Sequence, residues 1–147
     1  MAGRRHTRED SGLVLDREGR WFHDGEPVEH PRIIEAFNRG LERDEAGRYV
    51  LRFGDDWCLV TVEDAPLQVD GLVCAGDEIV VTLSSGLTER LRPQTLSVRG
   101  GVLYCVAESG LTARFSRSAQ FALGSLLEER PGGYVLVLKG VEHPIAG

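Results

Sequence analysis

The sequence predicts an α+β protein, mainly β, made of two repeated units of antiparallel strands that each carry one packed helix. Three observations support this class: short apolar runs between turn residues, two stretches with helical periodicity, and a pattern that occurs twice. The first copy begins at Trp21-Phe22-His23 and ends at Tyr49-Val50-Leu51. The second begins at Leu103-Tyr104-Cys105 and ends at Tyr134-Val135-Leu136.

The repeat divides the 147 residues into a tail and two units. We expect a disordered tail over residues 1–11, an N-terminal repeat unit over 12–66 and a C-terminal repeat unit over 67–147. The tail is rich in charge and lacks the apolar core of a signal peptide. No run approaches the roughly 20 apolar residues of a membrane span.

Strands and one helix account for the N-terminal unit. Apolar runs around residues 13–15 and 20–23 flank a polar turn and predict a hairpin. A helix is expected from Pro31 to Asp44, with Ile34, Phe37 and Leu41 on its apolar face. Residues 49–53 and 57–63 then form a second hairpin around Gly54-Asp55-Asp56.

The C-terminal unit repeats this order after an additional hairpin at residues 67–74 and 78–84. Strands are expected at 95–99, 102–107 and 111–115, followed by a helix over 116–129 and strands at 134–138 and 141–145. The helix carries apolar residues at Ala119, Leu123 and Leu127. Gly124 weakens it and suggests a close contact. Because the connections are short, we expect antiparallel sheets, with each helix packed on the sheet of its own half.

Composition excludes several classes of function. The formal net charge is -6, and no Lys/Arg run is longer than Arg4-Arg5, whereas duplex binding requires a clustered basic face. The sequence has no P-loop, dinucleotide fingerprint or nucleophile elbow. No His/Cys spacing is typical of zinc. We therefore expect no nucleic-acid or membrane partner, no metal and no cofactor.

The three cysteines indicate the compartment. Cys58, Cys74 and Cys105 are widely spaced, odd in number and placed in apolar runs. This pattern is typical of unpaired, reduced thiols in a cytosolic protein. Together with the missing export signal, it predicts a cytoplasmic location.

Several blocks resemble the bacterial Domain of Unknown Function 1285 family. In the N-terminal half they are Trp21-Phe22-His23-Asp24-Gly25-Glu26-Pro27-Val28, Gly47-Arg48-Tyr49 and Val62-Glu63-Asp64-Ala65-Pro66-Leu67. In the C-terminal half they are Tyr104-Cys105-Val106-Ala107, Gly110-Leu111-Thr112-Ala113-Arg114 and Arg117. The resemblance implies two repeated β-rich units with one helix each, and an involvement in signalling. Gln120-Phe121 stands where the family pattern has an aromatic pair.

Five residues are candidates for binding a ligand, and no catalytic residue is assigned. They are Trp21, His23, Glu63, Asp64 and Arg117. The first four place an aromatic ring, a titratable ring and two carboxylates in the blocks that carry the resemblance. Arg117 starts a helix whose amide donors favour anions. The alternative interpretation is structural, with the aromatic ring in the core and the polar groups at hairpin ends.

His23 and Asp24 form the only adjacent His-Asp pair among these blocks. Because adjacent residues on a strand point to opposite faces, we do not expect them to share a ligand. No catalytic constellation emerges, so we favour a non-enzymatic module that binds a protein or a small molecule. The alternative is a small-molecule-binding or hydrolytic enzyme that uses His23, Glu63, Asp64 and Arg117.

Overall fold

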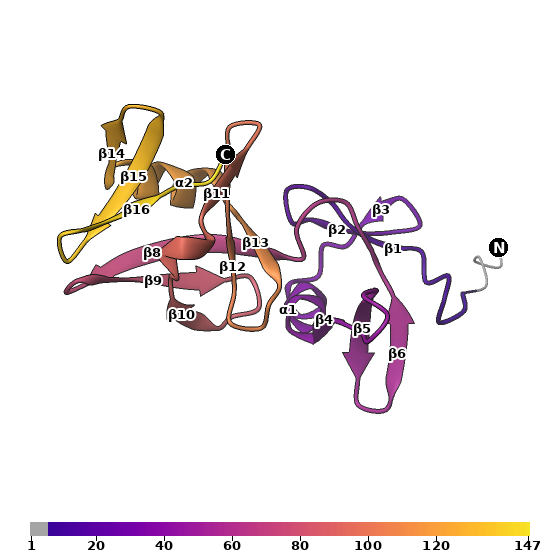
Figure 1. Ribbon diagram of the computed structural model, residues 1–147. Coiled ribbons are helices and arrows are strands. Elements are labelled where there is room, and N and C mark those ends of the chain that lie inside the picture. Colours follow the sequence, from indigo (N-terminus) through magenta and orange to yellow (C-terminus); the bar gives the residue numbers. More distant parts are fainter. Residues whose placement is uncertain (1–5) are drawn as a thin grey trace. The chain divides into compact units, whose positions relative to one another are not determined.

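The computed structural model describes residues 6–147 and confirms an α+β fold that is mainly β. The chain divides into two compact units, with the boundary between Pro66 and Leu67. Within residues 6–147, sixteen short strands and two α-helices follow one another along the chain (Figure 1). No helix of this part of the chain has the length and apolar character needed to cross a membrane.

The first unit consists of seven strands and one helix. They are β1 (Leu13–Leu15), β2 (Trp21–His23), β3 (Glu26–Pro27), α1 (Pro31–Gly40), β4 (Leu41–Arg43), β5 (Tyr49–Phe53), β6 (Asp56–Leu59) and β7 (Thr61–Val62). One sheet has the order β3-β2-β1-β7 and the other the order β4-β5-β6. Helix α1 packs against β5, and the core gathers apolar residues of both sheets around Trp21 and Leu51.

The second unit consists of nine strands, one α-helix and one short 3-10 helix. They are β8 (Leu67–Ala75), β9 (Glu78–Leu83), β10 (Thr88–Arg90), η1 (Pro93–Thr95), β11 (Ser97–Arg99), β12 (Val102–Val106), β13 (Thr112–Phe115), α2 (Arg117–Gly124), β14 (Leu127–Arg130), β15 (Gly133–Leu138) and β16 (Val141–Pro144). One sheet has the order β10-β9-β8-β13-β12-β11 and the other the order β14-β15-β16. Helix α2 packs against β8 and β13.

The strand order of the first unit recurs in the second. Each unit has a three-stranded antiparallel meander, a helix and a second antiparallel meander. In each, the chain then returns beside its first strand: Val14 pairs with Thr61 in parallel, and Ser97 pairs with Ala146 in parallel. Strands β8, β9 and β10 are an addition to the second unit, joined to the repeated part by parallel pairing of β8 with β13.

The pairing register follows the repeated sequence. Leu41 lies opposite Leu51 in the first unit, and Leu127 lies opposite Leu136 in the second. Leu51 and Leu136 are both fully buried. The Val-Leu pair of each Tyr-Val-Leu triplet therefore takes the same place in the core of its unit, whereas Tyr134 is exposed.

Parallel pairing departs from the expected antiparallel sheets. Strand β7 pairs in parallel with β1, and β13 pairs in parallel with β8. Parallel neighbours need long connections. These are supplied by whole intervening segments rather than by single turns.

Both helices are shorter than the sequence predicts. Leu41 begins β4 instead of extending α1, and Leu127 begins β14 instead of extending α2. The same apolar spacing suits a helix face and a strand that is buried on one side, and the pairing of each leucine with β5 or β15 decides the outcome. The close contact expected at Gly124 is absent, since nothing lies within 4 Å of a Cβ there. It occurs at Gly40, where a Cβ would lie 3.0 Å from the Arg52 carbonyl oxygen.

The segment before β1 lies against the first unit. Residues 1–5 of the expected disordered tail fall outside the described residues, but residues 6–11 differ from that expectation. The Ser11 hydroxyl donates to the Leu59 carbonyl at 2.5 Å and accepts from the Leu13 amide at 3.1 Å. The Leu59 amide donates to the Arg8 carbonyl at 2.7 Å. Hydrogen bonds rather than burial of apolar side chains hold this segment in place. Its charge-rich composition therefore gave no sign that it packs against the first unit.

Candidate functional site

The structure distributes the five candidate residues over different surroundings. Trp21 is buried in the core, where its indole N–H donates to the Asn38 amide oxygen at 2.8 Å. Its ring meets that of Phe37 edge to face, with 5.1 Å between centroids. Trp21 is thus a packing residue that ties β2 to α1, as the structural interpretation expects.

The strand register keeps His23 away from Glu63 and Asp64. Strand β1 lies between β2 and β7, with His23 level with Leu13 at one end. Glu63 follows the residue level with Leu15, and its amide donates to the Leu15 carbonyl at 2.9 Å. From ordinary strand spacing and rise, the backbones of His23 and Glu63 are roughly 14 Å apart. The register therefore does not bring the imidazole and these carboxylates into one site.

His23 has a different carboxylate partner, which is Asp24. The His23 Nε2 and Asp24 Oδ2 atoms are 3.9 Å apart. The opposite-face argument fails because β2 ends at His23 and Asp24 occupies a left-handed turn position with φ of 49°. The Asp-Gly pair at residues 24–25 contains the turn signal from which this conformation could have been inferred.

A second imidazole joins this pair from the segment before β1. The His6 Nε2 lies 2.8 Å from the Asp24 Oδ2, and the two imidazole centroids are 4.6 Å apart. One ligand atom from each of His6, His23 and Asp24 lies within 4.8 Å of the others. Sequence reasoning missed His6 because only the folding of the segment along β6 brings it beside the turn.

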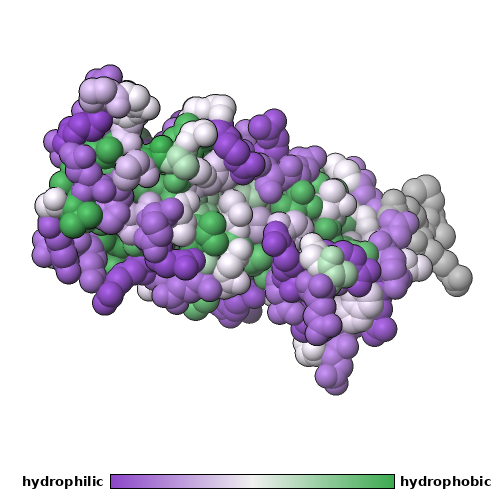
Figure 2. All heavy atoms as spheres, viewed as in Figure 1, coloured by the Kyte–Doolittle hydropathy of each residue, from purple (hydrophilic) through white to green (hydrophobic). Residues whose placement is uncertain are grey.

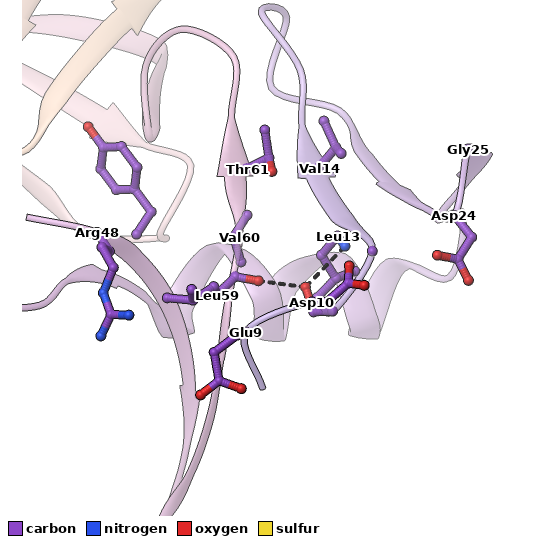
Figure 3. Close-up of a pocket in the computed structure, with 13 residues that line it drawn as sticks. Glu9, Asp10, Leu13, Val14, Asp24, Gly25, Arg48, Leu59, Val60 and Thr61 are labelled. Atoms are coloured by element: carbon purple, nitrogen blue, oxygen red, sulfur yellow. Dashed lines mark hydrogen bonds between the residues drawn. The ribbon is translucent and has the colours of Figure 1, made fainter. Parts of the chain in front are cut away.

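Two pockets flank this segment. The first, of about 630 Å³, is lined by Glu9, Asp10 and Asp24 together with Arg48 and residues of β1 and β7. Figure 3 shows Asp24 and Arg48 at opposite ends of it, with Val60 and Leu13 between them. Three carboxylates against one guanidinium make this pocket acidic.

The second pocket, of about 540 Å³, combines His6 and His23 with an apolar wall that includes Ile33, Phe37 and Trp57. Arg8 stands at its edge, 3.0 Å from the Asp56 carboxylate and 5.6 Å from the centre of the Trp57 ring. The Trp57 amide, followed by Arg8, holds the pKa of Asp56 below its ordinary value. Burial raises the pKa of the Cys58 thiol in this pocket, so the thiol stays protonated near neutral pH.

Arg117 belongs to a pocket of about 910 Å³ in the second unit. Helix α2 begins at Arg117, capped by the Ser116 hydroxyl, which accepts from the Ala119 amide at 3.2 Å. The lining also includes Arg114, Phe121 and Tyr134. None of the lining residues is Asp or Glu, although the whole chain has a formal net charge of -6.

Gln120 fixes one wall of this C-terminal pocket. Its amide oxygen accepts from the Leu103 amide at 3.0 Å, and its amide nitrogen donates to the Gly101 carbonyl at 2.8 Å. These bonds hold α2 against the β11–β12 turn. Phe121, the next residue, has 83% of its surface exposed and projects beside this fixed point. Figure 2 shows that apolar residues interrupt a mostly hydrophilic surface in separate spots.

Comparison with known proteins confirms the family resemblance. Residues 5–65 match the family model described as the N-terminal domain of Domain of Unknown Function 1285. A crystal structure of a DUF1285 family protein from Silicibacter pomeroyi DSS-3 shares the fold, with a TM-score of 0.73 and 22% identity over 92% of this chain and 79% of that chain. Another from Shewanella baltica OS155 has a TM-score of 0.64 and 20% identity over 78% of this chain and 91% of that chain. No curated protein matches.

Proposed function

We propose that the protein is a ligand-binding module whose C-terminal pocket takes a small molecule with a flat apolar body and an anionic group. One observation carries this proposal: the pocket places the exposed Arg117 guanidinium beside exposed aromatic surface, in a lining free of carboxylates. Arginine binds planar anions such as carboxylate and phosphate through paired hydrogen bonds. The aromatic residues offer faces on which a flat ligand can lie.

The exposure of the aromatic side chains supports this assignment. Phe121 and Tyr134 have 83% and 54% of their surfaces in contact with solvent. Burying apolar surface is favourable by roughly 25 cal/mol per Å², so a ligand that covers both rings gains affinity from them. The chain does not use Phe121 for its own core, in contrast to Leu123 two residues later, which is fully buried.

A non-catalytic role in bacterial signalling is the setting that fits this proposal, with the ligand as the signal and the module in the cytoplasm. The family resemblance suggested signalling, and the three cysteines are free thiols in the structure. The enzymatic alternative needs His23, Glu63, Asp64 and Arg117 to act together. The first two lie at opposite ends of one sheet, so the geometry gives this alternative less support.

The test uses two fluorescent probes that share an aromatic body and differ in charge. 8-Anilinonaphthalene-1-sulfonate is anionic, and N-phenyl-1-naphthylamine is neutral. We expect the full chain to bind the anionic probe at one site and the neutral probe more weakly. Arg117→Gln should weaken binding of the anionic probe by about 10-fold and leave the neutral probe unaffected, because only the first has a charge to pair.

Phe121→Ser should weaken both probes. The matched controls are Arg90→Gln and Leu87→Ser, which change an exposed arginine and an exposed apolar residue outside the pocket. Near-ultraviolet circular dichroism verifies that each variant keeps its tertiary packing, since these dyes also bind loosened proteins. Equal loss of affinity in the pocket variants and the controls would refute the proposal.

A further inference from the structure

We propose that His6, His23 and Asp24 form a binding site for a divalent transition metal, with Zn²⁺ as the best match. This site is in the N-terminal unit and is independent of the pocket proposed above. Two imidazole nitrogens and one carboxylate oxygen converge there, each within 4.8 Å of the others. Three protein ligands of this kind leave the fourth tetrahedral position open to water or to a ligand.

The distances suit one small ion. Zinc bonds of about 2.0 Å in a tetrahedron place two ligand atoms about 3.3 Å apart. The observed separations from the Asp24 Oδ2 are 2.8 Å to the His6 Nε2 and 3.9 Å to the His23 Nε2. The two values bracket the required spacing, and the two imidazole ligand atoms lie within 4.8 Å of each other, so changes of at most about 1.5 Å in these separations complete the geometry. The side chains are 28% to 47% exposed, which gives an ion access from solvent.

The backbone around Asp24 supports the carboxylate in an unusual way. Asp24 adopts φ of 49°, which a residue with a side chain rarely does, and its amide donates to the Gly12 carbonyl at 2.9 Å. Gly12 has φ of 75°, and a Cβ there would lie 2.1 Å from the Asp24 Oδ1 and 3.2 Å from the His6 Nε2. Only glycine leaves room for the carboxylate and the imidazole together. The left-handed conformations of Gly12 and Asp24, whose backbones are joined by this hydrogen bond, thus help to bring the three ligands together.

The donor set determines which ions should bind. Imidazole suits zinc, nickel and copper, whereas Mg²⁺ and Ca²⁺ prefer sets made only of oxygen. A site with two imidazoles and one carboxylate should therefore bind Zn²⁺ and not Mg²⁺. The ion would connect the segment before β1 to the turn after β2, which are joined here by the His6–Asp24 hydrogen bond.

The test is isothermal titration of Zn²⁺ into the full chain without an affinity tag. The Cys74→Ser background removes the exposed thiol, which could bind zinc by itself. We expect one ion per chain and no heat from Mg²⁺. His6→Gln and His23→Gln should each weaken Zn²⁺ binding by more than about 10-fold, which is the loss produced by changing even a partner of a metal ligand.

His143→Gln is the matched control, because it removes a histidine of the second unit that is distant in sequence from the site. It should leave Zn²⁺ affinity unchanged. Gly12→Ala changes no ligand yet should also weaken binding, since its Cβ displaces the carboxylate. The visible absorption of bound Co²⁺ provides a second readout, and it should fade in the same variants. Absence of a 1:1 complex, or equal binding by His23→Gln and His143→Gln, would overturn the proposal.

Discussion

The two units share one frame, which is a three-stranded meander, a helix, a second meander and a parallel return to the first meander. They differ in what has been added to this frame. In the first unit, the edge strand β3 is only two residues long, and β2 ends at the exposed His23. In the second unit, the equivalent residue is Cys105, which is buried because β13 beyond it continues into β8 and the rest of a six-stranded sheet. The frame thus places Leu51 and Leu136 at equivalent buried positions. The added strands decide whether an equivalent position is exposed, as at His23, or buried, as at Cys105.

A second difference concerns the segment before β1. The Leu59 amide holds this segment in place, because it donates a hydrogen bond to the Arg8 carbonyl at 2.7 Å. The equivalent residue in the second unit is Pro144, which has no amide hydrogen to donate. A comparable segment could not dock there in the same way. The cluster of His6, His23 and Asp24 in the first unit has no counterpart among the described residues of the second.

The largest expected effect tests whether the frame is common to both units. Leu51→Ala and Leu136→Ala each remove a fully buried side chain at equivalent positions of β5 and β15. Each should lower the free energy of unfolding by roughly 2–5 kcal/mol, and the two losses should be similar. Urea denaturation measures both. A loss below about 1 kcal/mol for one of them would break the equivalence of the two cores.

A smaller effect is expected where each helix is tied to its unit. Asn38 on α1 accepts from the Trp21 indole, and Gln120 on α2 accepts from the Leu103 amide. Gln120→Ala should cost roughly 1–2 kcal/mol, because it loses two hydrogen bonds and leaves an amide unpaired. Asn38→Ala should cost a similar amount, roughly 1–2 kcal/mol, since it leaves the indole N–H of the buried Trp21 unpaired.

The control for these two variants is Glu35→Ala, which removes an exposed ion pair with Arg39 and should change stability by less than about 0.5 kcal/mol. Thermal and urea denaturation compare the three. If Gln120→Ala behaves like the control, the bonds from α2 to the β11–β12 turn do not contribute to stability.

The smallest perturbation is thiol labelling, which compares the cysteines without a mutation. Burial raises the pKa of Cys105 from its ordinary value near 9 to about 12, and burial also raises that of Cys58. A raised pKa lowers the thiolate fraction at any given pH, and only the thiolate reacts. With a disulfide reagent at pH 8, the exposed Cys74 should react first.

As the pH rises from 8 to 10, Cys58 should begin to react while Cys105 stays protected. In the denatured protein all three thiols should react with the reagent at similar rates, which is the control for reagent access. If Cys105 were modified as quickly as Cys74, the six-stranded sheet would not shield it, and the contrast with His23 would disappear.

Much of the frame could be predicted from the sequence. The matched Tyr-Val-Leu triplets identified equivalent strands, and the apolar periodicity before them placed a helix in each unit. The helix ends were misplaced because Leu41 and Leu127 satisfy both a helical and a strand pattern. Their pairing with Leu51 and Leu136 is a long-range interaction that local spacing does not contain.

The candidate sites were less predictable. His23 and Arg117 were selected, and the structure places each in a pocket, but with different partners from those expected. Asp24 was set aside because a strand was assumed to continue through it. His6 gave no local signal at all, since its position depends on hydrogen bonds made by Arg8 and Ser11 further along the segment.

In each unit, the return of the last segment to the first strand of the repeated part has a kinetic consequence. The meanders within a unit join neighbours in sequence, whereas the parallel pairings of Val14 with Thr61 and of Ser97 with Ala146 close a loop around the repeated part of each unit. Closing a long loop costs chain entropy before it gains contacts, and such pairings slow folding. The hairpins and helices should therefore form early, and the final parallel pairing should limit the rate at which each unit reaches its native state.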